Sequence, residues 1–475
     1  PAARCRPPTM NPALPEPKPR PTKYEAIADE LAHAIVSGQY APGEKLPPHR
    51  VLAKRLGVTA GTVSRAYARL EQRALALARV GDGTYVRNLD LGQTGPAHAT
   101  APAMTDLAHN VAIPVGEVPA LRQALADLAR PDAVATASLL RYQPEAGMAH
   151  HRLAGARWLQ RQFGTQGLAE RVMMTHGAQH ALAAVLRTVA RTGDTILTES
   201  LSYSGMLELA RSLRLQVIGL EMDDEGLLPD ALEHAARSYR SRMVFCTPSL
   251  HNPTTATMSL ARRRAIAAVL ARHKMLLIED VVHAAVMAQP LPAIASMLPD
   301  QSFLLASFSK AMAPGLRVGY LEASAPWLDK VAASIRADCW MVAPLMPEIL
   351  TRWMMSGQAE QMVASQRQAI AERLRLAVQC LRGLVFRSTP DLPHLYLALP
   401  APWTVPQFTA AVRQAGVLVR TMDHFAAGRH APPAAVRISL NAASSTDELR
   451  QGLQALAGVL HAGAGAAKPP SHSNP

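Results

Sequence analysis

The chain has 475 residues, of which 49% are hydrophobic, and its 49 Lys and Arg outnumber its 36 Asp and Glu, so the formal net charge is +13. This length suffices for one large and one small domain, whereas no apolar run approaches the ~20 residues that a membrane span requires. The four cysteines, at positions 5, 246, 339 and 380, lack metal-ligand spacing and suit a reducing compartment. These features exclude a membrane-spanning or disulfide-stapled protein and predict a cytoplasmic one.

The first part of the chain predicts a small domain behind an unstructured extension. Residues 1–20 are rich in proline and arginine and lack the apolar stretch of a signal peptide, so we expect them to be disordered. Within residues 21–88, the turn Gly57-Val58-Thr59 separates two helical patterns, and Thr59 is suited to cap the second one, Ala60 to about Gln72. A glycine turn in the segment 80–86 predicts a β-hairpin. This order is typical of a helix-turn-helix followed by a wing.

The surface of this small domain is basic. In the second helix Val63, Tyr67 and Leu70 recur at the spacing of an inward face, and arginines and hydroxyls occupy the outward positions. Residues 1–90 hold fourteen Lys and Arg against eight Asp and Glu, a net of +6 in about a fifth of the chain. Such a surface attracts phosphates in a salt-dependent way. A generic solvated face is the alternative interpretation of the charge alone.

As a set, these motifs resemble GntR-type winged helix-turn-helix domains. The resemblance rests on Arg50-x-Leu52-Ala53, Gly57-Val58-Thr59, Thr62-Val63 and Gly81-x-Gly83-Thr84-Tyr85-Val86. It implies binding of double-stranded DNA at paired half-sites by a homodimer. The residues that we assign to the DNA-binding surface are Arg50, Thr59, Thr62, Ser64, Arg65, Arg69 and Thr84.

A larger second domain is expected after a flexible connection. Residues 89–105 are rich in Gly, Pro, Ala and Thr with little periodicity and predict a linker. Residues 106–463 form the predicted large domain, and residues 464–475, mostly Gly, Ala, Pro and Ser, predict a disordered tail.

One segment of the large domain has the pattern of a phosphate site. A strand-like run at Met173-Met174-Thr175 is followed by a small-residue turn and a helical pattern. Helix N-termini bind phosphate through free backbone N–H groups and the helix dipole. Gly177 permits close approach of a ligand, so the amides of Ala178 and Gln179 are the predicted phosphate donors.

Two further segments carry a carboxylate and a lysine. The apolar run Met275–Ile278 ends in Glu279-Asp280, so a buried strand delivers Asp280 at its carboxyl end, where open α/β sheets bind ligands; a helix N-cap is the alternative role. Further on, Lys310 stands between the hydroxyls of Ser307 and Ser309 and the positive charge of Arg317. This is the layout of a lysine that holds pyridoxal 5'-phosphate (PLP) as a Schiff base. A solvated surface lysine is the alternative for Lys310 taken alone.

From about Asp106 to Gly463 these motifs resemble fold type I PLP-dependent aminotransferases, which implies an α/β fold with a mostly parallel sheet. By that resemblance Asp280 keeps the pyridine nitrogen protonated, Asn252 donates to the ring oxygen, and Tyr203 stacks on the ring. Tyr142 would reach the phosphate of the neighbouring subunit. Arg437, one arginine in the apolar strand pattern Ala435–Leu440, would grip an effector carboxylate; an internal salt bridge is its alternative.

Two positions depart from the family pattern. His283 stands where relatives carry a tyrosine that hydrogen-bonds the ring oxygen, and histidine can donate there with a charge that depends on pH. Thr255 stands where a glycine usually follows Asn-Pro-Thr, so the loop is expected to be reshaped. Both changes put efficient turnover in question, and cofactor binding is still expected.

Joined, the two parts resemble the MocR subfamily of GntR regulators, in which a winged helix is fused to an aminotransferase-like effector domain. This resemblance implies a PLP-dependent transcriptional regulator that senses PLP, an amine or an amino acid. Two alternatives stay open. One is an active aminotransferase with a basic appendage, and the other is a DNA-binding protein whose large domain has lost PLP and only dimerises.

Overall fold

The structure is a computed structural model that describes residues 22–37, 39–40, 44–73, 75–79, 82–86, 104–130, 135–428 and 431–465. The chain divides into two compact units, Pro1–Arg87 and Asn88–Pro475. The predicted N-terminal extension, nearly all of the predicted linker and most of the predicted tail fall outside the described residues. The last helix, α16 (Thr446–Gly465), extends two residues beyond the predicted boundary at 463.

The first unit is a winged helix-turn-helix. Its elements are α1 (Lys23–Val36), α2 (His49–Leu56), α3 (Ala60–Gln72), β1 (Ala76–Arg79) and β2 (Gly83–Val86). Gly57 ends α2 in the left-handed conformation, with φ 63°, and the Thr59 side chain accepts from the Thr62 N–H at the start of α3. Strands β1 and β2 pair antiparallel and form the wing. The turn, the capped helix and the hairpin predicted from the sequence are therefore confirmed.

The inward face of α3 holds this unit together. Val63, Ala66, Tyr67 and Leu70 are buried, and the Tyr67 hydroxyl donates to the Pro47 carbonyl at 2.7 Å. Lys45 joins the wing to the loop before α2, because its Nζ lies 2.8 Å from Asp82 and its backbone bridges to Tyr85.

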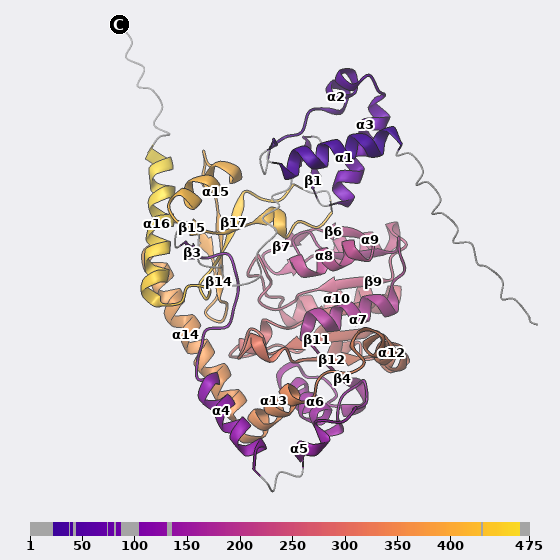
Figure 1. Ribbon diagram of the computed structural model, residues 1–475, viewed down its shortest axis with the longest axis vertical. Helices are drawn as coiled ribbons and strands as arrows, with labels where there is room; N and C mark the ends of the chain where they lie inside the picture. The colour runs from indigo at the N-terminus through magenta and orange to yellow at the C-terminus, as the bar shows by residue number, and fades with distance from the viewer. Residues whose placement is uncertain are drawn as a thin grey trace, which may run out of the picture. The chain divides into compact units, whose positions relative to one another are not determined.

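The second unit contains a seven-stranded sheet with the order β4-β12-β11-β10-β9-β5-β6 (Figure 1). Strands β11, β10, β9, β5 and β6 run parallel, and β12 is antiparallel to both of its neighbours. The α/β class with a mostly parallel sheet is as predicted. The bounds are β4 Val172–Thr175, β12 Gly319–Ala323, β11 Ser302–Ser307, β10 Leu276–Asp280, β9 Met243–Cys246, β5 Thr195–Glu199 and β6 Gln216–Leu220.

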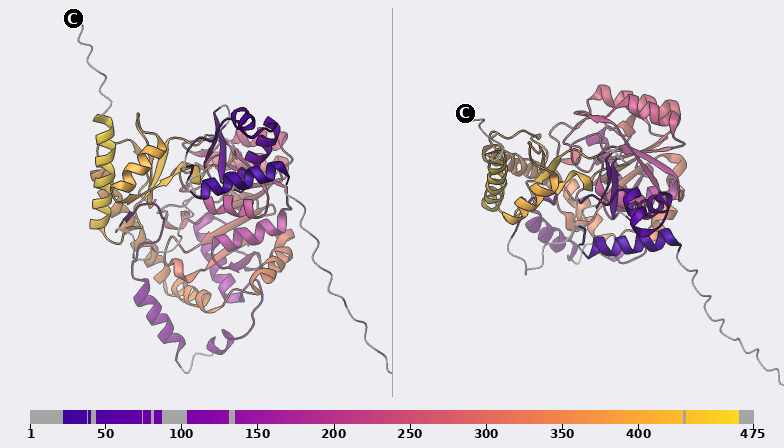
Figure 2. Two further views of the ribbon diagram at one scale, coloured as in Figure 1. Left: turned by 45° about the horizontal axis from the view of Figure 1, so that its top comes forward. Right: turned by 90° about the horizontal axis from the view of Figure 1, so that it is seen from above.

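Both faces of this sheet are covered. Alternate residues of one strand enter different cores: Met243 and Phe245 pack with α7 (Ala178–Val189), α8 (Ser204–Ser212) and α12 (Leu328–Cys339), whereas Val244 and Cys246 pack with the other helices. Figure 2 shows the ribbon of the chain from two further directions. The helices of the second core are α6 (Ala149–Phe163), α9 (Pro229–Ser238), α10 (Leu260–His273), α13 (Leu345–Ser356) and part of α14 (Gln358–Cys380), with α4 (Glu117–Leu128) at its edge.

A smaller C-terminal part completes the second unit. Its four-stranded sheet has the order β13 (Phe386–Arg387), β14 (His394–Ala398), β17 (Ala435–Ser439), β16 (Arg420–Thr421), and it packs with α14, α15 (Val405–Gln414) and α16. The chain enters this part through β3 (Thr105–Asp106), which pairs with β15 (Val417–Leu418). The segment that follows β3 therefore starts beside the C-terminal sheet.

None of the helices in the described ranges is both long and apolar enough to cross a bilayer.

Candidate cofactor site and DNA-binding surface

Lys310 lies in the loop that follows β11, close to the carboxyl ends of the parallel strands. Its side chain is half-buried, and its Nζ donates to the backbone carbonyl of Asn110. Burial, and then the positive charges of Arg437 and Arg317, lower the pKa of the Lys310 amine to about 8. A lysine with that pKa is partly neutral near pH 7–8, which is what a nucleophilic amine requires.

Asp280 ends β10, the strand beside β11. Its Oδ1 accepts from the Val282 N–H at 2.9 Å, and burial raises the pKa of its carboxyl to about 6. No salt bridge to Asp280 is found among the described side chains, so a protonated ring nitrogen would complement it. Tyr203 is close enough for the Asp280 charge, after burial, to help raise the pKa of its phenol to about 12.

An anion cradle lies where α7 begins. Gly177 has φ 76°, and a Cβ at that position would come within 3.0 Å of Arg317 Nη2. Only glycine therefore lets the Arg317 guanidinium approach the first turn of α7, whose N–H groups have no acceptor within the helix. Ser307 and Ser309 lie on the same side, with their hydroxyls 3.0 Å apart and Arg317 Nη1 3.4 Å from Ser309 Oγ.

The amides of Ala178 and Gln179 belong to that first turn. The Gln179 side chain donates to the Gly205 carbonyl at 2.9 Å, so its backbone rather than its side chain is the group left for a phosphate. The cradle thus combines a guanidinium, two hydroxyls and helix amides, which is a donor set that fits a phosphate.

Arg437 lies on β17 and is only 5% exposed. Its Nη1 donates to Asn252 Oδ1 at 2.8 Å, its Nη2 donates to the Ala108 carbonyl, and its Nε has no partner. Burial, and then the charge of Arg420, lower the pKa of this guanidinium to about 9. The alternative of an internal salt bridge finds no carboxylate partner for Arg437 within the described ranges.

Asn252 is oriented by this contact. Because its Oδ1 accepts from Arg437, its amide nitrogen is the group left to donate to a ligand. Buried donors without acceptors, together with a half-buried lysine and an uncompensated carboxylate, form a site whose polar groups fit PLP carrying an anionic amino acid.

His283 is buried beside these groups, and its Nδ1 has no partner. Burial, and then the charges of Lys310 and Arg437, lower its pKa to about 3. The imidazole is therefore uncharged near neutral pH, so the pH-dependent charge expected from the sequence does not arise in the physiological range. A neutral imidazole can still donate one hydrogen bond.

Thr255 has a φ of 72°, in the left-handed region that favours glycine, and its N–H donates to the His251 carbonyl at 2.8 Å. A β-branched residue in this conformation costs about 1–2 kcal/mol relative to glycine. The expectation that threonine reshapes this loop relative to the family stays a prediction.

We expect Thr255→Gly to raise the free energy of unfolding by about 1 kcal/mol, because relief of the positive φ outweighs the added chain entropy of glycine in the unfolded state. The midpoint of urea unfolding measures this change. Thr255→Ala is the matched control, since it trims the side chain and keeps the strained φ. If the alanine variant gained as much as the glycine variant, the backbone conformation would not be the cause.

The structure does not bring Tyr142 to the site of its own chain. Its side chain is 83% exposed, and its ring packs 6.0 Å from that of Trp340, which is itself 58% exposed. Leu140, nearby in sequence, is 88% exposed. A contact of Tyr142 with a phosphate can therefore come only from another subunit.

Three side chains of the site were missed from the sequence. The backbone carbonyl of Asn110 accepts a hydrogen bond from Lys310 Nζ, and its side-chain amide nitrogen lies 2.9 Å from His394 Nδ1. His394 and His251 are buried, and the His394 and His283 rings are 5.9 Å apart. Of the three, only His394 lies on an apolar strand, and an isolated histidine there does not distinguish a site residue from a core histidine. Asn110 and His251 lie outside helices and strands, where the sequence carries no periodic signal.

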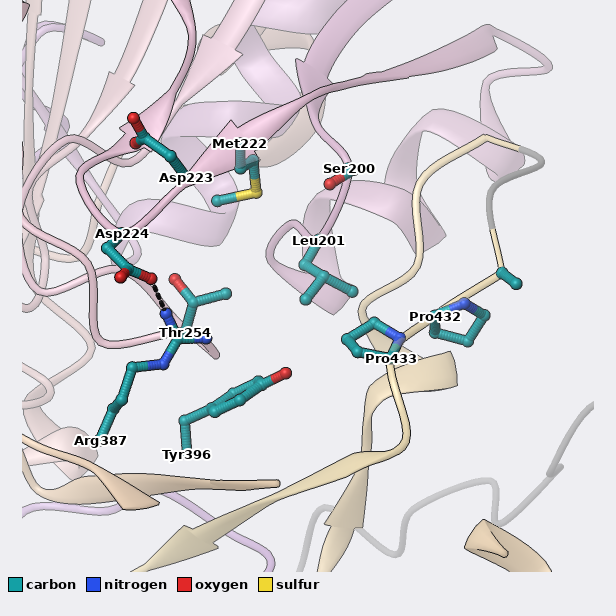
Figure 3. A pocket seen from close by; sticks show the side chains of 11 residues that line it. Ser200, Leu201, Met222, Asp223, Asp224, Thr254, Arg387, Tyr396, Pro432 and Pro433 are labelled. Carbon is teal, nitrogen blue, oxygen red and sulfur yellow. Dashed lines mark hydrogen bonds and ion pairs between the residues drawn. The ribbon is translucent and has the colours of Figure 1, made fainter. Parts of the chain in front are cut away.

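A separate open pocket of about 220 Å³ lies near the edge of this region (Figure 3). It is lined from the large sheet's side by Leu201 and Thr254 and from the C-terminal sheet by Tyr396, and the ion pair between Asp224 and Arg387 spans it. Lys310 and Asp280 do not line it. Two residues of the cofactor site, Tyr203 and Asn252, lie two positions away in sequence from the lining residues Leu201 and Thr254.

In the first unit, α3 presents Arg65, Ser64 and Arg69 to solvent, and Arg50 is exposed on α2. Arg65 and Arg50 have no ion pair among the described side chains. Ser64 is tied to His49 Nδ1 at 2.9 Å, and Thr59 and Thr62 bond each other at the cap, so their hydroxyls mainly order the helix start. These residues lie on one helix-turn-helix, as a DNA-reading surface requires.

Thr84 differs from this set. Its side chain is only 4% exposed on β2, and its carbonyl accepts from the Leu46 N–H at 2.8 Å. The sequence motif assigned it to the DNA-binding surface, but the alternation of β2 turns its side chain inward. Its role is packing of the wing against the loop before α2, and it offers no surface to DNA.

Taken together, fold and site define a two-part protein: a winged helix-turn-helix unit and a unit with the fold of an aminotransferase. Residues 103–456 match the family model "Aminotransferase class I and II", and residues 23–86 match "Bacterial regulatory proteins, gntR family". The chain belongs to the class I and II aminotransferase family and carries a gntR-family domain. This fusion is the MocR-type architecture.

Relatives that align along most of this chain are named as regulators. The HTH-type transcriptional regulator YdeF of Bacillus subtilis is 29% identical over 92% of this chain and 94% of its own length. The pyridoxine biosynthesis transcriptional regulator PdxR of Corynebacterium glutamicum is 28% identical over 80% of this chain and 81% of its own length. The kynurenine aminotransferase structure from Pyrococcus horikoshii has a TM-score of 0.69 with 19% identity, covers 78% of this chain and 93% of its own, and shows the shared fold.

Proposed function

We propose that this protein is a DNA-binding transcriptional regulator whose second unit binds PLP through Lys310 and senses PLP, an amine or an amino acid. The observation that carries the proposal is the presence, in one chain, of a helix-turn-helix with free arginines and a buried site of uncompensated polar groups around Lys310. An active aminotransferase would need the same site and has no use for the reading surface.

Each residue has one task in this proposal. Arg317, Ser307, Ser309 and the first-turn amides of α7 hold the phosphate, and Asp280 holds a proton on the ring nitrogen. Tyr203 and His283 border the ring, and Asn252 donates to its oxygen. When bound, PLP supplies an aldehyde that couples to amines. Arg437 then selects ligands with a carboxylate, since a buried guanidinium lacking an anionic partner favours one.

A route from the site toward the DNA-binding unit is supported by the segment Leu107–Val111. Its carbonyls accept from Lys310 at Asn110 and from Arg437 at Ala108, and it follows directly on the residues that join the two units. A cofactor on Lys310 and a carboxylate on Arg437 both compete with those carbonyls. Binding therefore favours a different position of the segment, and a ligand shifts an equilibrium only through such a difference.

A homodimer is part of the proposal. Tyr142 and Trp340 are exposed and in ring contact on the second unit, and Leu140, two residues before Tyr142, is exposed as well; exposed apolar side chains that gather in this way mark interaction surfaces. A second copy placed there would carry its Tyr142 toward the phosphate cradle and would present two winged helices to paired half-sites.

Footprinting on the DNA that flanks the protein's own gene, at stated salt and with and without PLP, tests the proposal. Protection of paired sites is expected, and a change with PLP makes the second unit the sensor. Absence of protection in both states would favour the aminotransferase alternative, and amine-dependent turnover would then be measured.

In the same assay Arg65→Ala is expected to weaken DNA binding about ten-fold or more, because a base or phosphate contact of arginine is worth about 1–3 kcal/mol. The cofactor absorbance should be unchanged. Arg161→Ala is the matched control, since Arg161 is also exposed but lies on α6 of the second unit. Loss of the cofactor spectrum in Arg65→Ala with normal DNA binding would contradict the division of labour between the units.

A further inference from the structure

A cluster of metal-ligating side chains lies outside the cofactor site. His150 and His151 occupy the first turn of α6, and Glu348 occupies the first turn of α13. His150 Nε2 and His151 Nε2 lie 2.8 and 3.0 Å from the same oxygen, Glu348 Oε2. Among the residues that the structure describes, this is the group of His, Cys, Asp or Glu whose ligand atoms all fall within 4.8 Å of one another.

The two helices hold these side chains in place. His151 is 1% exposed and Glu348 is 6% exposed, while Trp158 of α6 and Ile349 of α13 pack in one hydrophobic core. A site on packed helices is positioned more firmly than one on loops. The His150 side chain is 48% exposed, which leaves an open side for an ion and water to enter.

Arg352 orients the carboxylate from behind. Its Nε donates to the other oxygen, Glu348 Oε1, at 2.8 Å, one helical turn further along α13. Carboxylate ligands of metals are commonly held by such an outer hydrogen bond. Because Arg352 holds Oε1, the other oxygen, Oε2, stays directed at the two imidazole nitrogens, and the three ligand atoms lie within 4.8 Å of one another.

We propose that His150 Nε2, His151 Nε2 and Glu348 Oε2 bind one divalent transition-metal ion, with water in the remaining position on the exposed side of His150. Two imidazoles and one carboxylate suit Zn²⁺, Co²⁺ and Ni²⁺ and are poor ligands for Mg²⁺ and Ca²⁺, which prefer oxygen donors.

The observed spacing fits such an ion with little movement. Bonds of about 2.0–2.1 Å to tetrahedral Zn²⁺ place neighbouring ligand atoms about 3.3 Å apart. The present N···O separations of 2.8 and 3.0 Å would widen by roughly 0.3–0.5 Å, which small side-chain rotations allow. The ion would join α6 to α13 and so tie the segment after Tyr142 to the core.

Titration of the tag-free, chelator-treated full-length protein with Co²⁺ tests the site, because Co²⁺ bound to nitrogen and oxygen ligands has a visible d–d absorption. We expect one Co²⁺ per chain, displacement by Zn²⁺ and no competition from Mg²⁺. His150→Ala removes an exposed ligand and is not expected to disturb folding, and it should weaken Co²⁺ binding at least ten-fold; Glu348→Gln should do the same.

His461→Ala is the matched control, since His461 is exposed on α16 far along the chain, and it should bind Co²⁺ as the unaltered protein does. Circular dichroism of each variant verifies the fold. Absence of a d–d band, or an equal band in His150→Ala with the fold intact, would overturn the proposal.

Discussion

Replacing Lys310 by alanine is expected to abolish the visible absorbance band of lysine-bound PLP and to leave basal DNA binding intact. The reason is that the Lys310 amine is suited to bind the cofactor: burial and two neighbouring arginines lower its pKa to about 8, and its Nζ donates to the Asn110 carbonyl inside the site. The helix-turn-helix unit contains none of the site residues, so its contacts with DNA are unaffected.

Absorbance after PLP addition and removal of excess cofactor measures the first effect, and fluorescence anisotropy with labelled DNA measures the second. Lys330→Ala is the control, because Lys330 is an exposed lysine on α12 of the same unit. An undiminished band in Lys310→Ala would end the assignment of the cofactor lysine. A variant within Leu107–Val111 that keeps the absorbance band and loses the effect of PLP on DNA binding would support the role of that segment as the route between the units.

Much of the fold was predictable because its signals are local. The apolar run before Asp280 is a buried parallel strand, and Thr59 caps α3 in the predicted place. Gly177 and Arg317 were predicted near a phosphate site, and the structure brings them into contact through a guanidinium that fits only beside glycine.

The contacts that were not predicted depend on chain segments far apart in sequence. Lys310 and Asn110 are 200 residues apart, and His151 and Glu348 are 197 apart. No periodicity links such positions; only the folded sheet and its helices bring them together. Thr84 shows that a local feature can also be unpredictable. In a short strand, successive side chains alternate between the exposed and the buried face, and the motif does not show on which face Thr84 lies.

Asp280 is expected to lower the stability of the cofactor-free protein and to strengthen its binding of PLP. Its folded-state pKa of about 6 is higher than the usual value of 3.8, so the charged carboxylate is disfavoured in the cofactor-free protein. A rise of the pKa from 3.8 to about 6 corresponds to about 3 kcal/mol of destabilisation at pH 7, and partial solvent access reduces that value. We therefore expect Asp280→Asn to raise the free energy of unfolding by about 1–3 kcal/mol at pH 7 without PLP.

The pH dependence has a definite sign. Well below pH 3.8 the carboxyl of Asp280 is protonated in both folded and unfolded protein, so the charge of Asp280 gives the two proteins no difference in stability there. Between pH 3.8 and about 6 the unfolded chain loses this proton while the folded protein keeps it, so the advantage of Asp280→Asn should grow across this range and reach its full size above about pH 6. Urea midpoints at pH 5, 6 and 7 measure this trend. Asp230→Asn, at an exposed position on α9, should change stability by less than about 0.5 kcal/mol.

PLP should reverse the order of the two proteins. The carboxylate that destabilises the empty site pairs with a protonated ring nitrogen, and an asparagine cannot supply the charge. Loss of one charge-assisted hydrogen bond of about 1.5–3 kcal/mol predicts PLP binding about ten- to hundred-fold weaker in Asp280→Asn. The unaltered protein should therefore gain more stability from PLP than the variant does. Equal PLP affinity in both proteins would mean that Asp280 faces something other than the pyridine ring. The buried carboxylate would then lower the free energy of unfolding without strengthening PLP binding.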